Sequence, residues 1–168
     1  LLSDNKGKEL TNMNAIIGQS GTGKSTLADA FGFLADCLEK GVEVACDLNG
    51  RGGYEKIISQ GSEESLEFEI YYRETSNEPP ITYELSIGLD KYERPIVEKE
   101  RLRQRRANEK HGRPLSFLYL EYGKGVAFKG INSGFSEEEN QEIGDKVDVE
   151  LADPRQLGIV TLGELREH

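Results

Sequence analysis

The sequence predicts a single α/β domain with α+β character, in which one long helix is followed by a β-rich, mainly antiparallel region. Two observations lead to this prediction. A glycine-rich loop at 18–25 lies between an apolar, strand-like run at 13–17 and a helix-like run at 25–40. After residue 65, apolar and polar residues alternate in runs joined by short connections, which is the period of strands with one buried face. A chain of 168 residues has the length of one ordinary domain with its own core.

The glycine-rich loop reads Gly-Gln-Ser-Gly-Thr-Gly-Lys-Ser from Gly18 to Ser25, which completes the pattern G-x-x-x-x-G-K-[ST]. Glycines in such a loop let backbone N–H groups turn inward around a phosphate chain. The first turn of the following helix adds unpaired N–H groups and the positive end of its dipole. Because the loop also has a strand before it and a helix after it, the sequence predicts a P-loop NTPase lobe that binds nucleotide phosphates.

Individual residues of this loop have expected roles. Lys24 is the predicted catalytic residue, since its ammonium group would reach the β- and γ-phosphates of ATP as a point charge. The Ser25 hydroxyl is the predicted protein ligand of Mg²⁺. The predicted nucleotide-binding residues are Gln19, Ser20, Gly21, Thr22, Gly23, Lys24, Ser25 and Thr26.

The single lobe, 1–168, divides into three parts. The first part, 1–60, holds the loop strand, the loop and the helix, whose apolar residues at helical spacing predict a face packed on a sheet. Those residues are Leu27, Ala30, Phe31, Leu34 and Leu38. Gly41 predicts the end of the helix, and the glycine-rich residues 47–53 predict an irregular loop.

The second part, 61–131, is predicted to consist of antiparallel strands. Alternation predicts a hairpin of 66–72 with 81–89, a third strand from Pro95 into a basic segment, and a further pair at 117–122 and 126–128. The third part, 132–168, is predicted to hold an acidic loop or short helix at 132–147 and a weak helix at 161–168.

Composition limits the classes of function. A net charge of −10 opposes nucleic-acid binding by the chain as a whole. One basic segment is an exception, and either a solvated hairpin tip or a contact with phosphates or an acidic partner would account for it. Its residues are Arg101, Arg103, Arg105, Arg106, Lys110 and Arg113. No apolar run has the length of a membrane span and the start does not resemble a secretion signal, so we expect a soluble, cytoplasmic protein.

The two cysteines, Cys37 and Cys46, stand without a C-x-x-C pattern or a histidine cluster. We therefore expect neither a zinc site nor a disulfide framework.

In its order of elements and in several residues, the chain resembles the amino-terminal lobe of the SMC/RecF-like ABC-type ATPases, including AAA-family ATPases and relatives of the OLD nucleases. The resemblance is carried by four segments, which are 15–27 around the loop, 30–34 (Ala-Phe-Gly-Phe-Leu), 51–53 (Arg-Gly-Gly) and 157–163 (Leu-Gly-Ile-Val-Thr-Leu-Gly). Gln19 and Thr22 differ from the Asn and the Ala or Ser that are usual in that family's loop.

The resemblance implies a homodimer in which two copies clamp ATP and Mg²⁺ between them, and in which hydrolysis opens the clamp. It also implies a second lobe with an apolar strand ending in Asp-Glu, a signature sequence and a switch histidine, and protein or nucleic-acid partners of the full-length protein. We find none of these second-lobe features, so we expect a fragment of a longer ATPase that binds ATP but hydrolyses it poorly alone. Asp47 and Glu121 end apolar runs that imitate the acid-bearing strand, and Gln156 is a candidate sensor of the γ-phosphate.

Two other classes of function remain open. A small phosphotransferase of the nucleoside- or nucleotide-kinase type would use the same loop, with 101–106 as a lid, although the missing βαβ alternation disfavours it. A non-catalytic interaction module would use nucleotide only to stabilise its fold, and its acidic surface would recruit a partner.

Overall fold

The computed structural model describes residues 21, 24–58, 65–73, 80–104, 114–128 and 146–164. Contacts divide the chain into a first unit, 1–32, and a second unit, 33–168. In the first unit, the described residues are Gly21 and the part of helix α1 (Lys24–Lys40) up to residue 32. The predicted strand at 13–17 lies outside the described residues.

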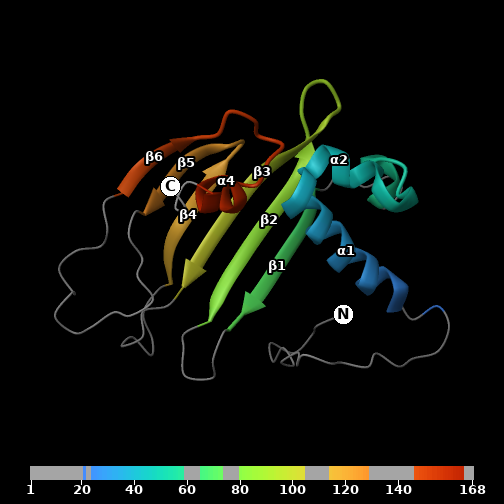
Figure 1. Cartoon of the computed structure of the whole chain (residues 1–168), viewed down its shortest axis with the longest axis horizontal. Helices are drawn as coiled ribbons and strands as arrows, with labels where there is room; N and C mark the ends of the chain where they lie inside the picture. Colours follow the sequence, from blue (N-terminus) through green and yellow to red (C-terminus); the bar gives the residue numbers. More distant parts are fainter. Residues whose placement is uncertain are drawn as a thin grey trace. The chain divides into compact units, whose positions relative to one another are not determined.

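Within the described residues, the second unit contains a six-stranded antiparallel sheet whose strands follow one another in chain order (Figure 1). The strands are β1 (Leu66–Tyr72), β2 (Ile81–Leu89), β3 (Pro95–Gln104), β4 (Leu115–Glu121), β5 (Lys124–Phe128) and β6 (Lys146–Glu150). Such a meander arises because antiparallel neighbours can be joined by short turns.

The alternating pattern predicted most of this sheet correctly. The hairpin of β1 with β2 is confirmed, with Leu66 opposite Ile87 and Tyr72 opposite Ile81. The third strand begins at Pro95, as predicted, and the β4–β5 pair is also confirmed. Strand β6 was not predicted, and the expectation of a loop or helix is wrong at residues 146–147. The rest of the predicted acidic loop lies outside the described residues.

Short helices flank the predicted irregular loop at 47–53, which itself contains one 3₁₀ turn and the irregular residues 51–53. They are α2 (Val42–Asp47), the 3₁₀ turn η1 (Leu48–Gly50) and α3 (Tyr54–Ile57). The interpretation of 42–47 as a strand ending in Asp47 is wrong, because Val42, Ala45 and Cys46 share one buried face at helical spacing. Helix α4 (Gly158–Glu164) begins three residues before the predicted helix at 161–168.

The buried face of α1 differs from the predicted one. Leu34 is buried as predicted, but Leu27, Phe31 and Leu38 are 45%, 51% and 44% exposed. The buried residues in the second half of α1 are Phe33, Leu34 and Cys37. The helix has two apolar faces, and the one that contains Phe33 packs against the sheet. The Phe33 ring stacks on Phe68, with the ring centroids 5.9 Å apart.

The core lies on one face of β1 to β3. Its buried residues are Phe33, Leu34, Cys37, Val42, Ala45, Cys46, Tyr54, Leu85, Ile87, Val97 and Leu157. The Tyr54 hydroxyl donates a hydrogen bond to the Ile87 carbonyl at 2.7 Å, which satisfies the one polar group of this side chain. Burial raises the pKa of the Cys37 thiol to about 12 and that of Cys46 to about 11, so both remain protonated at neutral pH.

None of the helices in the described part of the chain combines the length and the apolar character that a bilayer crossing requires.

Arg51 connects the second half of α1 to the short helices that follow it through hydrogen bonds. Its side chain is only 5% exposed, and Nη1 donates to Asp36 Oδ2 at 2.5 Å and to the Ala45 carbonyl at 3.0 Å. The guanidinium carbon lies 5.4 Å from the centroid of the Phe33 ring. The two glycines after Arg51 have φ of +75° and +100°, a turn that side chains disfavour.

Glu100 is a fully buried residue on β3 whose carboxylate holds the start of α4 against the sheet. Its oxygens accept hydrogen bonds from Gly158 N at 2.5 Å, Ile159 N at 3.0 Å and the Tyr83 hydroxyl at 2.9 Å. Burial raises the pKa of Glu100 above its usual value, and these three hydrogen bonds oppose the rise. A Cβ at position 158 would lie 2.3 Å from Leu120 Cδ1, so the approach of α4 requires glycine there.

We expect Arg51→Ala to lower the free energy of unfolding by about 3 kcal/mol, because it leaves the largely buried Asp36 carboxylate without its cation. Urea denaturation followed by circular dichroism measures the change. Arg94→Ala is the matched control, since Arg94 also pairs with an aspartate but has a half-exposed side chain. Equal losses in the two variants would contradict the special role of Arg51.

We expect Glu100→Gln to lower the free energy of unfolding at pH 5 by about 2 kcal/mol, because the amide nitrogen of glutamine cannot accept a hydrogen bond in place of a carboxyl oxygen. The stability that a raised carboxyl pKa contributes is fully present below the ordinary value of 4.5 and is lost as pH rises through the raised pKa. The advantage of the parent over the variant should therefore shrink between pH 5 and pH 8. Glu39→Gln, at an exposed position on α1, is the control, and an advantage that grows with pH would refute the assignment.

Candidate nucleotide-binding site

Helix α1 begins at Lys24, so the predicted phosphate loop leads directly into a helix start. The predicted binding residues that the structure describes are Gly21, the backbone of Lys24, Ser25 and Thr26. Gly21 is exposed with φ of +82°, and no atom lies within 4 Å of the position that a Cβ would take. This left-handed conformation is one that occurs in anion-binding nests of backbone amides.

The first turn of α1 suits an anion. It contains no acidic residue, and Ser25 and Thr26 are exposed in it. The first N–H groups of a helix have no intrahelical partner, and the dipole of a 17-residue helix adds positive potential at the same end. The Ser25 hydroxyl, the predicted Mg²⁺ ligand, is therefore beside unpaired N–H donors. The side chain of Lys24 and the predicted residues Gln19, Ser20, Thr22 and Gly23 lie outside the described part of the chain.

The structure describes both acids that imitated a metal-binding strand end, Asp47 and Glu121. Asp47 ends helix α2 and not a strand. Glu121 ends β4, and both edges of β4 are occupied by antiparallel partners, β3 and β5. Within the described residues, the end of β4 at Glu121 therefore has a strand partner on each edge. The exposed Glu121 carboxylate instead accepts a hydrogen bond from the Tyr119 hydroxyl.

Gln156, the candidate sensor of the γ-phosphate, is half-buried in the second unit. A Cβ at Gly41 would lie 2.6 Å from Gln156 Nε2, so this side chain packs directly against the turn between α1 and α2. Gly41 has φ of +83° and its N–H donates to the Cys37 carbonyl at 3.0 Å, which confirms the predicted end of α1. The sensing role of Gln156 remains a prediction.

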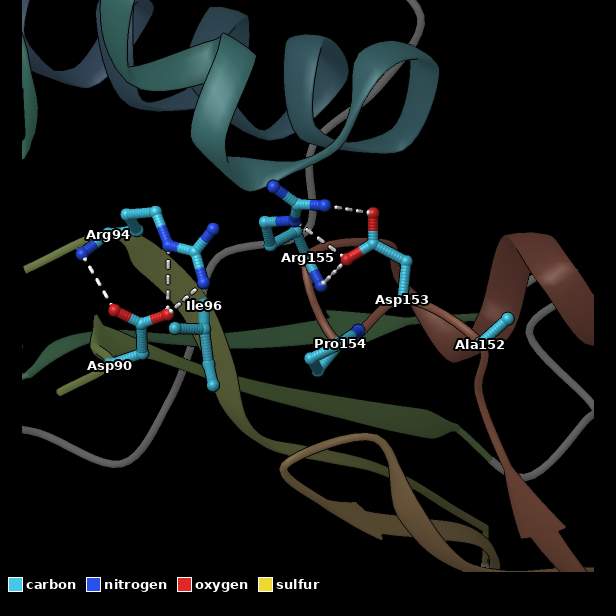
Figure 2. Close-up of a pocket in the computed structure, with 7 residues that line it drawn as sticks. All are labelled: Asp90, Arg94, Ile96, Ala152, Asp153, Pro154 and Arg155. Carbon is cyan, nitrogen blue, oxygen red and sulfur yellow. Dashed lines mark hydrogen bonds and ion pairs between the residues drawn. The ribbon is translucent and has the colours of Figure 1, made fainter. Parts of the chain in front are cut away.

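A polar pocket of about 280 Å³ lies between the β2–β3 turn and the segment that connects β6 to α4 (Figure 2). It is lined by Asp90, Arg94, Ile96, Ala152, Asp153, Pro154 and Arg155. The pocket belongs entirely to the second unit.

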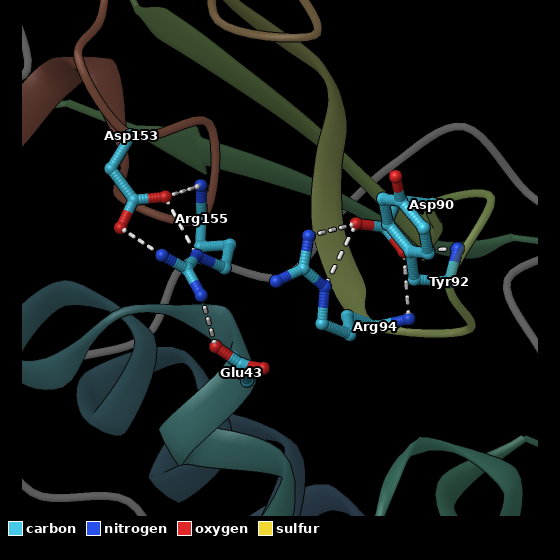
Figure 3. Close-up of polar contacts among 6 residues, drawn as sticks. All are labelled: Glu43, Asp90, Tyr92, Arg94, Asp153 and Arg155. Carbon is cyan, nitrogen blue, oxygen red and sulfur yellow. Dashed lines mark hydrogen bonds and ion pairs between the residues drawn. The ribbon is translucent and has the colours of Figure 1, made fainter.

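Both arginines of this pocket are paired with carboxylates (Figure 3). Arg94 donates to Asp90 Oδ2 from Nε at 3.1 Å and from Nη2 at 2.8 Å. Arg155 donates to Asp153 from Nε at 2.7 Å and from Nη2 at 3.0 Å, and to Glu43 Oε2 from Nη1 at 2.8 Å. Hydrogen bonds from Arg155 hold the pKa of Asp153 below its usual value. Because the three carboxylates outnumber the two guanidinium groups, the pocket does not suit an anion. The pair of Arg155 with Glu43 instead joins α2 to the segment between β6 and α4.

Sequence reasoning did not predict the roles of Arg51, Glu100 and Arg155. The sequence does contain an indication for Glu100, because this charged residue occupies a position in the alternating strand where an apolar, buried residue is expected. The pairing of Arg155 with Glu43 has no local signal, since 112 residues separate the two.

Comparison with known proteins adds the family. A family model described as "AAA domain, putative AbiEii toxin, Type IV TA system" matches residues 13–155. No curated protein and no solved structure gives a significant match. The family match covers the predicted loop strand, the phosphate loop, α1 and the whole sheet, which is most of the 168-residue chain. The chain therefore belongs to this AAA-domain family of P-loop ATPases.

Proposed function

We propose that this chain is the nucleotide-binding lobe of an SMC/RecF-like, OLD-like ATPase, whose Mg²⁺-dependent hydrolysis of ATP drives a conformational switch. The observation that supports this proposal most strongly is the complete phosphate-loop pattern at 18–25, which leads into a helix that begins at Lys24. Membership of the AAA-domain family supports nucleotide binding in general.

In the proposed complex, the amides of residues 19–23 and the first turn of α1 surround the β- and γ-phosphates of ATP. Lys24 contacts the same phosphates, and the Ser25 hydroxyl supplies one of the oxygen ligands of Mg²⁺. The metal ion would neutralise charge that develops on the phosphate oxygens. Hydrolysis is an in-line attack of water on the γ-phosphate, and Lys24 stabilises the charge that spreads over its oxygens.

We further propose that hydrolysis requires a second lobe and a second copy of the protein, with ATP held between the two copies. Two findings are consistent with this division. Asp47 ends a helix and not a strand, and Glu121 ends a strand of the antiparallel sheet of the second unit. On this proposal, the lobe alone binds ATP and turns it over slowly.

The antiparallel sheet disfavours the kinase alternative. Nucleoside kinases of the P-loop type would require βαβ units, which give parallel strands, whereas every strand pair in the described residues is antiparallel. Arg101 and Arg103, which that alternative placed in a mobile lid, lie within β3.

We expect Lys24→Ala to weaken the binding of ATP with Mg²⁺ at least about tenfold, because it removes the side-chain cation proposed to contact the phosphates. Isothermal titration calorimetry on the folded chain measures the affinity. Lys40→Ala, which removes an exposed lysine from the other end of the same helix, is the control and should leave binding unchanged. Absence of binding by the folded parent would refute the proposal.

Single-turnover hydrolysis by the full-length protein separates the ATPase from the non-catalytic module. Activity in the parent that Lys24→Ala removes is the expected result. If the parent protein binds nucleotide but neither the parent nor Lys24→Ala hydrolyses it, the result would favour the non-catalytic interaction module.

We expect Ser25→Ala to raise the Mg²⁺ concentration needed for half-maximal ATP binding by about tenfold, because it removes an oxygen ligand of the metal. Ser25→Thr keeps the hydroxyl group that the pattern requires and is the matched variant. A magnesium titration at fixed ATP, followed by the fluorescence of a labelled nucleotide, gives the comparison. Identical titrations for Ser25→Ala and Ser25→Thr would exclude Ser25 as a ligand.

A further inference from the structure

Strand β1 forms one edge of the sheet (Figure 1). Its seven residues pair with β2 in a continuous register, and within the described residues no strand lies on its other side. Among the same residues, no backbone–backbone hydrogen bond outside the ladder with β2 involves 67–72. Alternate residues of β1 therefore direct N–H and C=O groups away from the sheet, where they are available to a further strand.

The edge of β1 has little protection against such pairing. Native proteins usually shorten an exposed edge strand, interrupt it with a bulge or place proline or lysine on it. β1 has the sequence Leu-Glu-Phe-Glu-Ile-Tyr-Tyr, and its only charged side chains are those of Glu67 and Glu69. Two carboxylates repel an acidic strand and attract a basic one, so this edge selects an incoming strand by its charge.

The side chains of β1 alternate between two chemically different faces. Phe68 and Ile70 are half-buried against the core, so alternation places Glu67, Glu69 and Tyr71 on the opposite face, where all three are exposed. We call these three residues the outer row of β1. Apolar side chains on one face of an added strand would cover more of Phe68 and Ile70, and those on its other face would meet the outer row.

Each member of the outer row suits a cation. Glu67 forms no ion pair with any described residue, and Glu69 is 3.4 Å from Arg103, which also pairs with Glu84. The Tyr71 side chain is 68% exposed, and the face of a tyrosine ring attracts an ammonium or guanidinium group. A strand with basic residues at alternate positions would therefore place one cation beside each member of the row.

Charge disfavours a second copy of this chain as the added strand. Pairing β1 with β1 of another copy would bring Glu67 and Glu69 of both copies to one seam. Pairing it with the other edge strand, β6, would add Asp148 and Glu150 against the single Lys146. Like charges across a strand pair destabilise it. Residues 1–20 of the chain also contain no run in which basic residues alternate with large apolar ones.

We propose that the unpaired edge of β1 binds an extended segment of a protein partner in which lysine or arginine alternates with apolar residues. The segment adds to the sheet as a further strand and forms hydrogen bonds with the backbone of β1. Its cations meet the outer row, and its apolar side chains extend the face that carries the core. This inference concerns only the second unit and goes beyond the proposed nucleotide site.

The first test compares two labelled peptides of the length of β1 by fluorescence anisotropy with the intact chain. One peptide alternates lysine and valine, and the other has the same composition with its lysines in one block. We expect the alternating peptide to bind at least about fivefold more tightly, because only its lysines can all lie on the side of the outer row. Its binding should weaken as salt rises.

Backbone methylation tests strand addition itself. Only one alternate set of amides in an added strand faces β1, and the other set faces away from it. N-methylation of one set in the alternating peptide should therefore weaken binding at least about tenfold, whereas N-methylation of the other set should be tolerated.

Charge reversal on β1 locates the site. The double variant Glu67→Lys with Glu69→Lys should weaken the alternating peptide at least about tenfold, because it replaces two attractive charges by repulsive ones. Glu67→Lys alone should have a smaller effect in the same direction and leaves every ion pair of the described residues intact. Glu39→Lys, at an exposed position on α1, is the control and should leave binding unchanged.

Any of four results would overturn the proposal. They are equal affinity for the two peptides, equal effects of the two methylation patterns, unchanged binding by the double variant when circular dichroism shows it folded, and a dimer of the parent chain that the alternating peptide dissociates in analytical ultracentrifugation. The last result would assign the edge to a second copy.

Discussion

The burial of one side of the sheet under the second half of α1 is the interaction on which the second unit depends. Phe33, Leu34 and Cys37 pack with Leu85 and Ile87, and each large apolar side chain removed from water contributes about 1.5–3 kcal/mol. An exposed ion pair contributes less than about 1 kcal/mol, so the many charged pairs on the opposite face cannot replace this core. The one-sided core also explains why the outer positions of β1 to β4 are polar.

Apolar burial has no direction, so it does not decide by itself which part of a helix meets which strand. Two charged groups supply that direction. Arg51 donates hydrogen bonds to the Asp36 carboxylate and to the Ala45 carbonyl, and Glu100 accepts hydrogen bonds from the first two N–H groups of α4. Charged groups are costly to bury unless they are fully paired, so alternative packings that separate these pairs are strongly disfavoured.

The strands were predictable because alternation is a local property that survives folding. The buried face of α1 was not predictable in this way. Leu27, Phe31 and Leu38 have helical spacing, as do the buried residues around Phe33. The two faces differ in their contacts with the sheet, such as the stacking of Phe33 on Phe68. The short helices at 42–57 were hidden by glycines at 41, 50, 52 and 53, all of which have positive φ at the helix boundaries. Strand β6 has only five residues, so its alternation of charged and apolar residues is too short to be distinctive without its pairing with β5.

The same distinction applies to the nucleotide site. Phosphate binding depends on residues that are contiguous in the chain, because backbone amides, a helix start, Lys24 and Ser25 all lie within 18–26. Such a site acts over a short range, since charges more than about 10 Å apart are screened in ordinary salt, and it is therefore compatible with a chain of net charge −10. The proposed hydrolysis differs, because it would require an acid and a γ-phosphate sensor from elements distant in the sequence. Asp47 and Glu121 both satisfied the local pattern of that acid, but Asp47 ends a helix and Glu121 ends a strand of the antiparallel sheet. The residues proposed to bind phosphate are thus specified by a local pattern, whereas the further groups that the proposed hydrolysis needs have no such pattern in this chain.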